Sequence, residues 1–242
     1  MPRSGPKTDR EHFGPAGRPA LVTAVDELSW LLSRGYNDRS ALKLVGDRHD
    51  LVRRQRTAVV RCSAPDDDVA DRARRRLDPA ALRGQRLAVD GFNAIILVES
   101  ALAGGVVLLG RDGCCRDLAS VHGSYRQADH TARALELLGQ AMADLGPTSV
   151  DWCLDRPVSN SGRLAATMEL LAAERGWPWR VELRNNPDRV LAEDRDAVVV
   201  SSDAWVLDSC ARWSDVVGHL VRARVPDAWL VDLAPPACGS PE

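Results

Sequence analysis

Residues 87–93 read Leu-Ala-Val-Asp-Gly-Phe-Asn and join a short apolar strand to the start of a helix. The strand ends at Asp90, and the pattern from Asn93 to Leu102 predicts the helix. A carboxylate between a buried strand and a helix is poorly placed for packing, but it is well placed for a ligand at the carboxyl end of a parallel sheet. This stretch therefore predicts a strand–helix unit of an α/β fold with a polar group at its exit.

Two later strands end in the same way, at Asp155 and at Asp203. Because the carboxyl ends of parallel strands converge at one edge of a doubly wound sheet, we expect the three carboxylates to lie close together. Their like charges would repel one another without a cation, and oxygen ligands suit Mg²⁺ or Mn²⁺. Asp188, at the start of a short helix, is a fourth candidate ligand. In the alternative interpretation, each aspartate caps the helix that follows it.

Strands and helices alternate from Arg86 onward, which predicts βαβ units and a mainly parallel sheet. We expect strands at 86–90, 106–109, 149–154, 180–184, 197–201 and 228–232. We expect helices at 93–103, 129–144, 160–175, 187–192, 204–210 and 214–222. One α/β domain would then span residues 84–234, with a frayed tail at 235–242.

The front of the chain predicts a small all-helical module over residues 20–80. Leu21, Val25, Leu28 and Leu32 follow helical spacing, and Asn37 is a suitable cap for the next helix. The preceding residues, 1–19, are rich in proline, glycine and charge, so we expect a disordered lead there.

The charges divide unevenly along the 242 residues. Residues 1–86 carry a net charge of about +6 and the remainder about −8, within a total of −2. A basic front, with arginines at 53, 54 and 56, beside an acidic back fits a nucleic-acid-binding module next to a metal-binding domain. Two solvated surfaces of different composition are the alternative.

The six cysteines contain no CxxC pair, which argues against a zinc knuckle. The first residues lack the apolar core of a signal peptide, and no apolar run is long enough to cross a bilayer. These features predict a cytoplasmic protein with reduced thiols.

Polar side chains near the predicted strand exits are further candidates for the site. The Asn93 amide could orient a water or a carboxylate, or it could cap its own helix. The hydroxyl of Ser202 could position Asp203. Ser159 precedes a helix whose free N–H groups could bind a phosphate, although an ordinary capping role is the favoured interpretation.

A dense polar segment, residues 111–126, offers possible contacts for a substrate. Arg116, His122, Tyr125 and Arg126 could bind a phosphate or stack on a base. The chain has no GxSxG turn, no GxGxxG fingerprint and no phosphate-binding P-loop, so it lacks the motifs of those enzyme classes.

The strand-exit motifs together resemble the PIN-like nuclease superfamily, in particular its NYN-type branch. The resemblance rests on residues 89–93, Asp155, Asp188 and residues 201–203. More narrowly, the chain resembles the family called domain of unknown function 434. That resemblance rests on residues 34–36, 41–47, 89–93, 112–117, 122–126, 155–159 and 202–203, and it covers roughly residues 20–220.

The superfamily resemblance implies a three-layer α/β/α sandwich that cuts RNA with Mg²⁺ or Mn²⁺. Asp90, Asp155 and Asp203 match its metal-binding carboxylates, Asp188 matches more loosely, and Glu99 could match an acidic residue on the helix after the first strand. We therefore expect a divalent-metal-dependent nuclease. The alternatives are a binding module for nucleic acid or protein that has lost the chemistry, and a small-molecule phosphohydrolase on a related fold.

Overall fold

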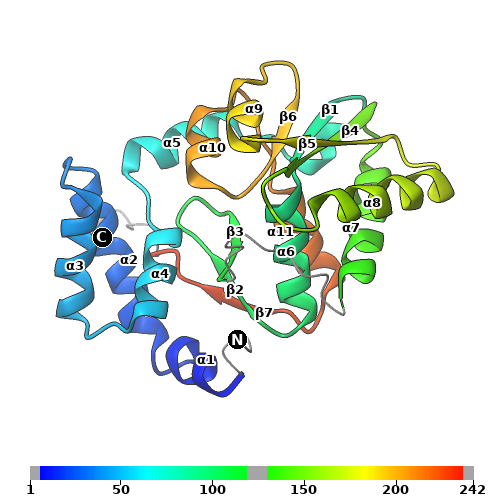
Figure 1. Cartoon of the computed structure of the whole chain (residues 1–242). Helices are drawn as coiled ribbons and strands as arrows, with labels where there is room; N and C mark the ends of the chain where they lie inside the picture. Colours follow the sequence, from blue (N-terminus) through cyan, green and yellow to red (C-terminus); the bar gives the residue numbers. More distant parts are fainter. Residues whose placement is uncertain (1–5, 119–129, 237–242) are drawn as a thin grey trace. The chain divides into compact units, whose positions relative to one another are not determined.

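The structure, a computed structural model, describes residues 6–118 and 130–236. The chain forms two compact units (Figure 1). The first, which we call the helical unit, comprises Met1–Ala73, Gly104–Leu118 and Trp229–Glu242. The second, the α/β unit, comprises Arg74–Ala103 and Ala119–Ala228.

A four-stranded parallel sheet organises the α/β unit, in the strand order β5-β4-β1-β6. Its strands are β1 (Arg86–Asp90), β4 (Ser149–Asp155), β5 (Trp179–Arg184) and β6 (Val198–Val200). The buried apolar residues of β1 lie between β4 and β6 and make it a central strand. The prediction of an α/β fold with a mainly parallel sheet is confirmed.

Helices lie on both faces of this sheet (Figure 1). They are α6 (Gly91–Leu102), α7 (Thr131–Leu145), α8 (Ser161–Arg175), α9 (Pro187–Glu193), α10 (Ala204–Ser209) and α11 (Val216–Arg224), with a 3₁₀ turn η1 (Pro79–Leu82) before β1. On β4, Leu154 faces Gly91 at the start of α6, and α8 packs against β5. The alternate β4 residues, Asp151 and Cys153, point to the opposite face, where α9 packs.

Three tryptophans form a stack on the α7 and α8 side of the sheet. Trp152 is fully buried, and its ring centroid lies 4.8 Å from that of Trp179. The ring of Trp177 lies at the same centroid distance from that of Trp179. The stack is tightly packed against α7, because a Cβ atom added to Gly139 would lie 2.0 Å from the Trp177 ring.

We expect Gly139→Ala to destabilise the protein by about 1–3 kcal/mol, because the new methyl group would overlap a ring that its neighbour holds in place. The measurement is urea unfolding followed by tryptophan fluorescence. Gly162→Ala is the matched control: it also lies in a helix, but its added Cβ meets nothing within 4 Å. Equal stability of the two variants would contradict the tight contact.

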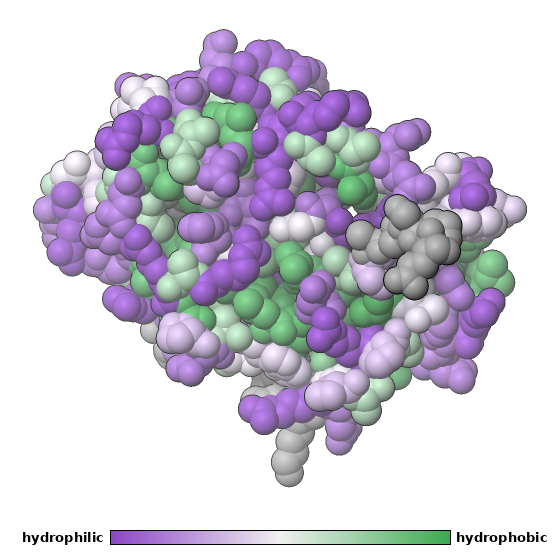
Figure 2. Space-filling view, turned by 180° about the vertical axis from the view of Figure 1, so that it is seen from behind, coloured by the Kyte–Doolittle hydropathy of each residue, from purple (hydrophilic) through white to green (hydrophobic). Residues whose placement is uncertain are grey.

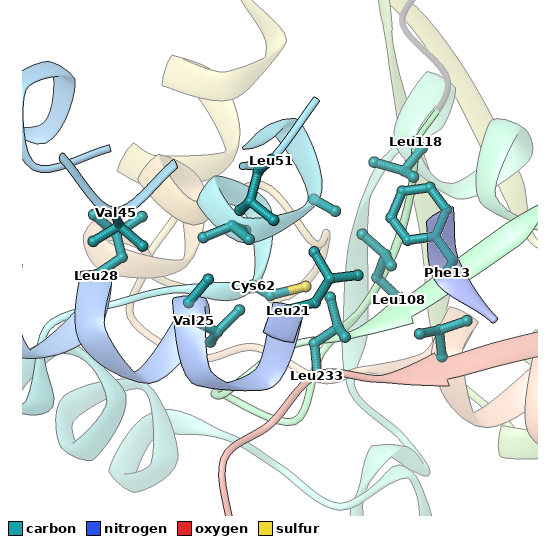
Figure 3. Close-up of a cluster of buried hydrophobic side chains, with 14 of the residues drawn as sticks. Phe13, Leu21, Val25, Leu28, Val45, Leu51, Cys62, Leu108, Leu118 and Leu233 are labelled. Carbon is teal, nitrogen blue, oxygen red and sulfur yellow. The ribbon is translucent and has the colours of Figure 1, made fainter. Parts of the chain in front are cut away.

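The helical unit combines the front helices with a second, three-stranded sheet. Its helices are α1 (Pro6–Phe13), α2 (Arg18–Leu32), α3 (Asp38–Arg48), α4 (Arg53–Cys62) and most of α5 (Asp66–Arg75). Its strands, in the order β3-β2-β7, are β3 (Cys115–Asp117), β2 (Val106–Leu109) and β7 (Trp229–Asp232). Side chains from α2, α4, β2 and the end of the chain, among them Leu21, Leu108 and Leu233, share one core (Figure 3).

The structure differs from the predicted domain boundaries at two strands. Residues 106–109 and 229–232 were expected in the α/β domain over 84–234, but they pair in parallel with each other in the helical unit. Alternation of strands and helices indicates parallel pairing, but it does not tell which sheet a strand joins.

The first residues also differ from the prediction of a disordered lead over 1–19. Helix α1 occupies Pro6–Phe13, and Phe13 is buried in the core of the helical unit. Asp9 accepts hydrogen bonds of 2.6 and 2.8 Å from Arg54. One buried aromatic side chain and one partly buried ion pair thus order a segment whose composition favours disorder.

Hydrophilic side chains cover much of the molecule seen from behind, with apolar patches between them (Figure 2). Across residues 6–118 and 130–236, no helix is both long enough and apolar enough to cross a membrane.

Candidate metal centre

Asp90 lies at the carboxyl end of β1 and is only 7% exposed. Its Oδ1 accepts a hydrogen bond of 3.4 Å from the backbone N–H of Asn93, so Asp90 caps helix α6. Its Oδ2 accepts a bond of 2.8 Å from the hydroxyl of Ser201, just beyond β6. Both oxygens are therefore fixed by groups at the same edge of the sheet.

A second set of bonds ties the start of α10 to the start of α6. The Asn93 side-chain oxygen accepts bonds of 3.0 Å from both the backbone N–H and the hydroxyl of Ser202. The backbone N–H of Asp203 donates to Ser201 Oγ at 3.1 Å, while Asp203 itself caps α10 through Val206. Helix capping and membership of a shared network are thus compatible for Asp90 and Asp203.

Electrostatic interactions connect the four predicted carboxylates, which we call the acidic set: Asp90, Asp155, Asp188 and Asp203. Burial raises the pKa of Asp90 to about 7; the bonds from Ser201 and Asn93 oppose this rise, and the charges of Asp188 and Asp203 add to it. Burial also raises the pKa of Asp188, with contributions from Asp203 and Asp155. The pKa of Asp155 is raised by burial. The strand-exit pattern has therefore selected residues whose charges interact.

The acidic set contains only carboxylate oxygens, the donor type that Mg²⁺ and Mn²⁺ prefer. Asp155 is not used as a cap, because Asn160 occupies the N-cap position of α8. Among the residues that the structure describes, however, no group of three or more His, Cys, Asp or Glu side chains is arranged closely enough to hold an ion. The residues fit a hard divalent cation in type, and their mutual repulsion is what a cation would relieve.

Two family models match different parts of the chain. The model of a family described as a domain of unknown function (DUF5616) matches residues 79–219, more than half of the chain. The chain belongs to the DUF5616 family. A second model, described as a protein of unknown function (DUF434), matches residues 20–75. The narrower resemblance is thus confirmed for the helical front, whereas the whole acidic set falls within the DUF5616 match.

A relative of this DUF5616 protein is known in Methanocaldococcus jannaschii. It is 28% identical over 146 residues, which cover 60% of this chain and 70% of the relative, and its name describes it only as an uncharacterized protein. No solved structure matches the chain.

The DUF5616 protein uses Arg116 differently from the prediction of a substrate contact. Its guanidinium group is buried in the helical unit and donates to Asp112 at 2.6 and 2.7 Å. Arg72, also buried, donates to the same carboxylate at 2.6 Å. Arg116 therefore holds the interior of this unit together and is not available to a phosphate.

The remaining predicted substrate contacts in this part of the chain are Ser159, His122, Tyr125 and Arg126. Ser159 is exposed in the short segment between β4 and α8. His122, Tyr125 and Arg126 lie outside the described residues.

Glu99, the candidate acid on the first helix of the DUF5616 match, lies away from the acidic set. It is fully buried and accepts a hydrogen bond from the Thr131 hydroxyl at the start of α7. Nine residues separate it from Asp90, a rise of about 13 Å along a helix. Glu99 is thus part of the helix packing of this unit.

Two of the three arginines expected to give the helical front its basic contacts are already paired. Arg54 binds Asp9, and Arg56 donates to Asp47 and to the Leu51 carbonyl, each at 2.8 Å. Arg53 remains exposed. The basic surface of the front is therefore smaller than its composition predicts.

Three residues that share a sheet face with Asp155 or follow Asp203 in the sequence were missed in the sequence analysis. Arg184 lies opposite Asp155 in the pairing of β5 with β4, and Arg180 lies opposite Asp151. Trp205 follows Asp203 by two residues and is 53% exposed. The strict alternation of Trp-Arg-Val-Glu-Leu-Arg over 179–184 was a usable signal, because it predicts a strand with one charged face.

Proposed function

We propose that this protein is a divalent-metal-dependent phosphodiesterase that cleaves RNA. The electrostatic interaction of these carboxylates carries the proposal: Asp188 and Asp203 act on Asp90, and Asp155 and Asp203 act on Asp188. Asp90, Asp155 and Asp203 would hold Mg²⁺ or Mn²⁺, with Asp188 assisting. When bound there, such an ion supplies charge neutralisation at phosphate oxygens and a lowered pKa for a water.

The protein's own groups would position this site. Ser201 and the Asn93 backbone hold the two oxygens of Asp90, so the carboxylate does not have to be ordered when substrate binds. The Asn93 side chain fixes the Ser202 segment and thereby the start of α10, which carries Asp203. Asn93 and Ser202 are accordingly positioning residues.

The indole of Trp205 favours a polynucleotide over a small phosphate ester. Within the described part of the α/β unit, Trp205 is the only tryptophan that is more than half exposed. An exposed aromatic face beside a phosphate-binding centre is a suitable surface for stacking a base.

The test is cleavage of a mixed single-stranded RNA by the purified full chain with Mn²⁺ and with EDTA. We expect cleavage with Mn²⁺ alone, and a loss of roughly 100-fold in Asp155→Asn, which removes a ligand without removing a helix cap. Asp227→Asn, at an exposed aspartate in the same unit that is not a member of the acidic set, is the matched control.

Other outcomes would favour the alternatives. Stabilisation by Mn²⁺ without cleavage by any variant would indicate a metal-binding module without the chemistry. Hydrolysis of a generic phosphomonoester but not of RNA would indicate a small-molecule phosphohydrolase. Equal cleavage by wild type and Asp155→Asn would place the activity elsewhere.

A further inference from the structure

A cavity of about 250 Å³ lies in the α/β unit, between α9 and the face of β4 and β5 that α9 leaves open. Its charged lining consists of Arg86, Asp151, Arg180, Glu182, Arg184 and Asp194. Helix α9 packs on β1 and β4, and the alternate residues of β5 on this face are exposed. The cavity is therefore open along β5.

The cavity and Asp155 of the acidic set lie on one face of β4. On β4, Asp151 and Cys153 line the cavity, and Asp155 is the next residue on that face. The strand pairing places Arg184 opposite Asp155 and Arg180 opposite Asp151. The line from Arg184 to Arg180 thus begins beside the acidic set and runs about 13 Å along the sheet.

The three arginines that line the cavity differ in how strongly they pair with carboxylates. Arg86 donates to Asp151 at 2.9 Å and to both oxygens of Asp194 at 2.7 Å, so it is fully engaged. Arg184 pairs with Glu182, and both side chains are about half exposed, at 46% and 49%. Such a surface pair contributes only about 0–1 kcal/mol, so an anion could replace Glu182. Arg180 has no ion pair with any residue that the structure describes.

We propose that this cavity binds the phosphate backbone of a single-stranded polynucleotide next to the acidic set, with Arg184 and Arg180 contacting different phosphates. The inference rests on the proposed function for the identity of the strand. A single strand fits the site better than a duplex, because its unpaired bases can stack on an exposed aromatic side chain such as Trp205. The cavity lining has three arginines and three carboxylates, so binding depends on direct guanidinium contacts and not on a long-range field.

The test is binding of a short fluorescein-labelled oligouridylate to the full chain, measured by fluorescence anisotropy in EDTA so that no cleavage occurs. We expect Arg180→Gln to weaken binding roughly five- to tenfold and to reduce the salt dependence by about 0.7 in the slope of log K against log salt. The double variant with Arg184→Gln should lose more. The matched control is Arg163→Gln, an exposed arginine on α8, which packs against β5 from the other face.

Binding by Arg180→Gln equal to that of Arg163→Gln would overturn the inference, as would the absence of oligouridylate binding by the wild type. Equal competition by polyglutamate would also overturn it, since the cavity would then select negative charge and not a nucleic-acid strand. The proposed function fails separately. Arg180-dependent binding without Mn²⁺-dependent cleavage would support the binding cavity and refute the nuclease. Mn²⁺-dependent cleavage with binding that Arg180→Gln does not change would support the nuclease and refute the binding cavity.

Discussion

Asp90→Asn should abolish RNA cleavage and, in EDTA at pH 8, make the protein more stable than the wild type. The loss of activity should be roughly 100-fold or more, because the variant removes a carboxylate that we propose as a metal ligand. The gain in stability should be on the order of 1–3 kcal/mol, because an uncharged amide replaces a carboxylate that is costly to ionise in its buried position.

The pH dependence of this gain follows from the raised pKa of Asp90. The pKa is about 7 in the folded protein and about 4 in an unfolded chain. Between these values the folded state retains a proton that the unfolded state has lost, so wild-type stability falls as pH rises from about 4 to 7. Asn cannot ionise, so Asp90→Asn should lack this fall and differ little from the wild type near pH 4.

Thermal melts of both proteins at pH 4, 5, 6, 7 and 8 in EDTA measure this difference. Asp227→Asn, an exposed aspartate, should follow the wild-type curve throughout. Adding Mn²⁺ should stabilise the wild type more than Asp90→Asn, because ligand binding stabilises the state that binds it. An Asp90→Asn variant that melts below the wild type at pH 8 in EDTA would show that the hydrogen bonds to Asp90 outweigh the cost of its charge.

The largest loss of stability should come from Asp112→Asn, at about 3–5 kcal/mol. Asp112 lies between two buried guanidinium groups, and the side chains of Arg72, Asp112 and Arg116 are 3%, 2% and 7% exposed. Burial alone would raise the pKa of Asp112, but the charges of Arg116 and Arg72 outweigh it and lower the pKa to about 2. Without the carboxylate, two buried cations would face each other across a neutral amide.

Equilibrium urea unfolding at pH 7 measures the effect of Asp112→Asn. The control is Asp66→Asn: Asp66 pairs with Arg111 at 2.5 Å in the same unit, but its side chain is 62% exposed, so we expect a loss below about 1 kcal/mol. The wild type should also lose stability as pH falls from about 4 to 2, where Asp112 takes up a proton in the unfolded state first. A small loss in Asp112→Asn would mean that the arginines find other partners.

The sequence predicted the local elements better than their assembly. The run around Asp90 predicted β1 and α6 because an apolar strand, a capping carboxylate and an apolar helix are all local features. It could not predict that β2 joins β7, since that pairing depends on contacts between residues more than a hundred positions apart. The short β3, whose residues Cys115–Asp117 are all buried, has no alternation to reveal it.

The residues of the candidate site also differ in how far the sequence alone could predict them. Asp90, Asp155, Asp188 and Asp203 were accessible to prediction because each lies at a strand exit or helix start, and strand exits converge in a parallel sheet. Arg116 was not, because nothing in a polar segment distinguishes an arginine that binds a phosphate from one that is buried against an aspartate. Asp112 is only four positions from Arg116, but the burial of this pair together with Arg72 of α5 depends on how distant segments pack.

The course of the chain through its two units affects the order in which they can fold during translation. The helical unit takes residues from the front, the middle and the end of the chain, and β7 pairs directly with β2. The α/β unit needs nothing beyond Ala228. The front helices therefore lack the complete three-stranded sheet of their unit until β7 has been made, however early they are synthesised.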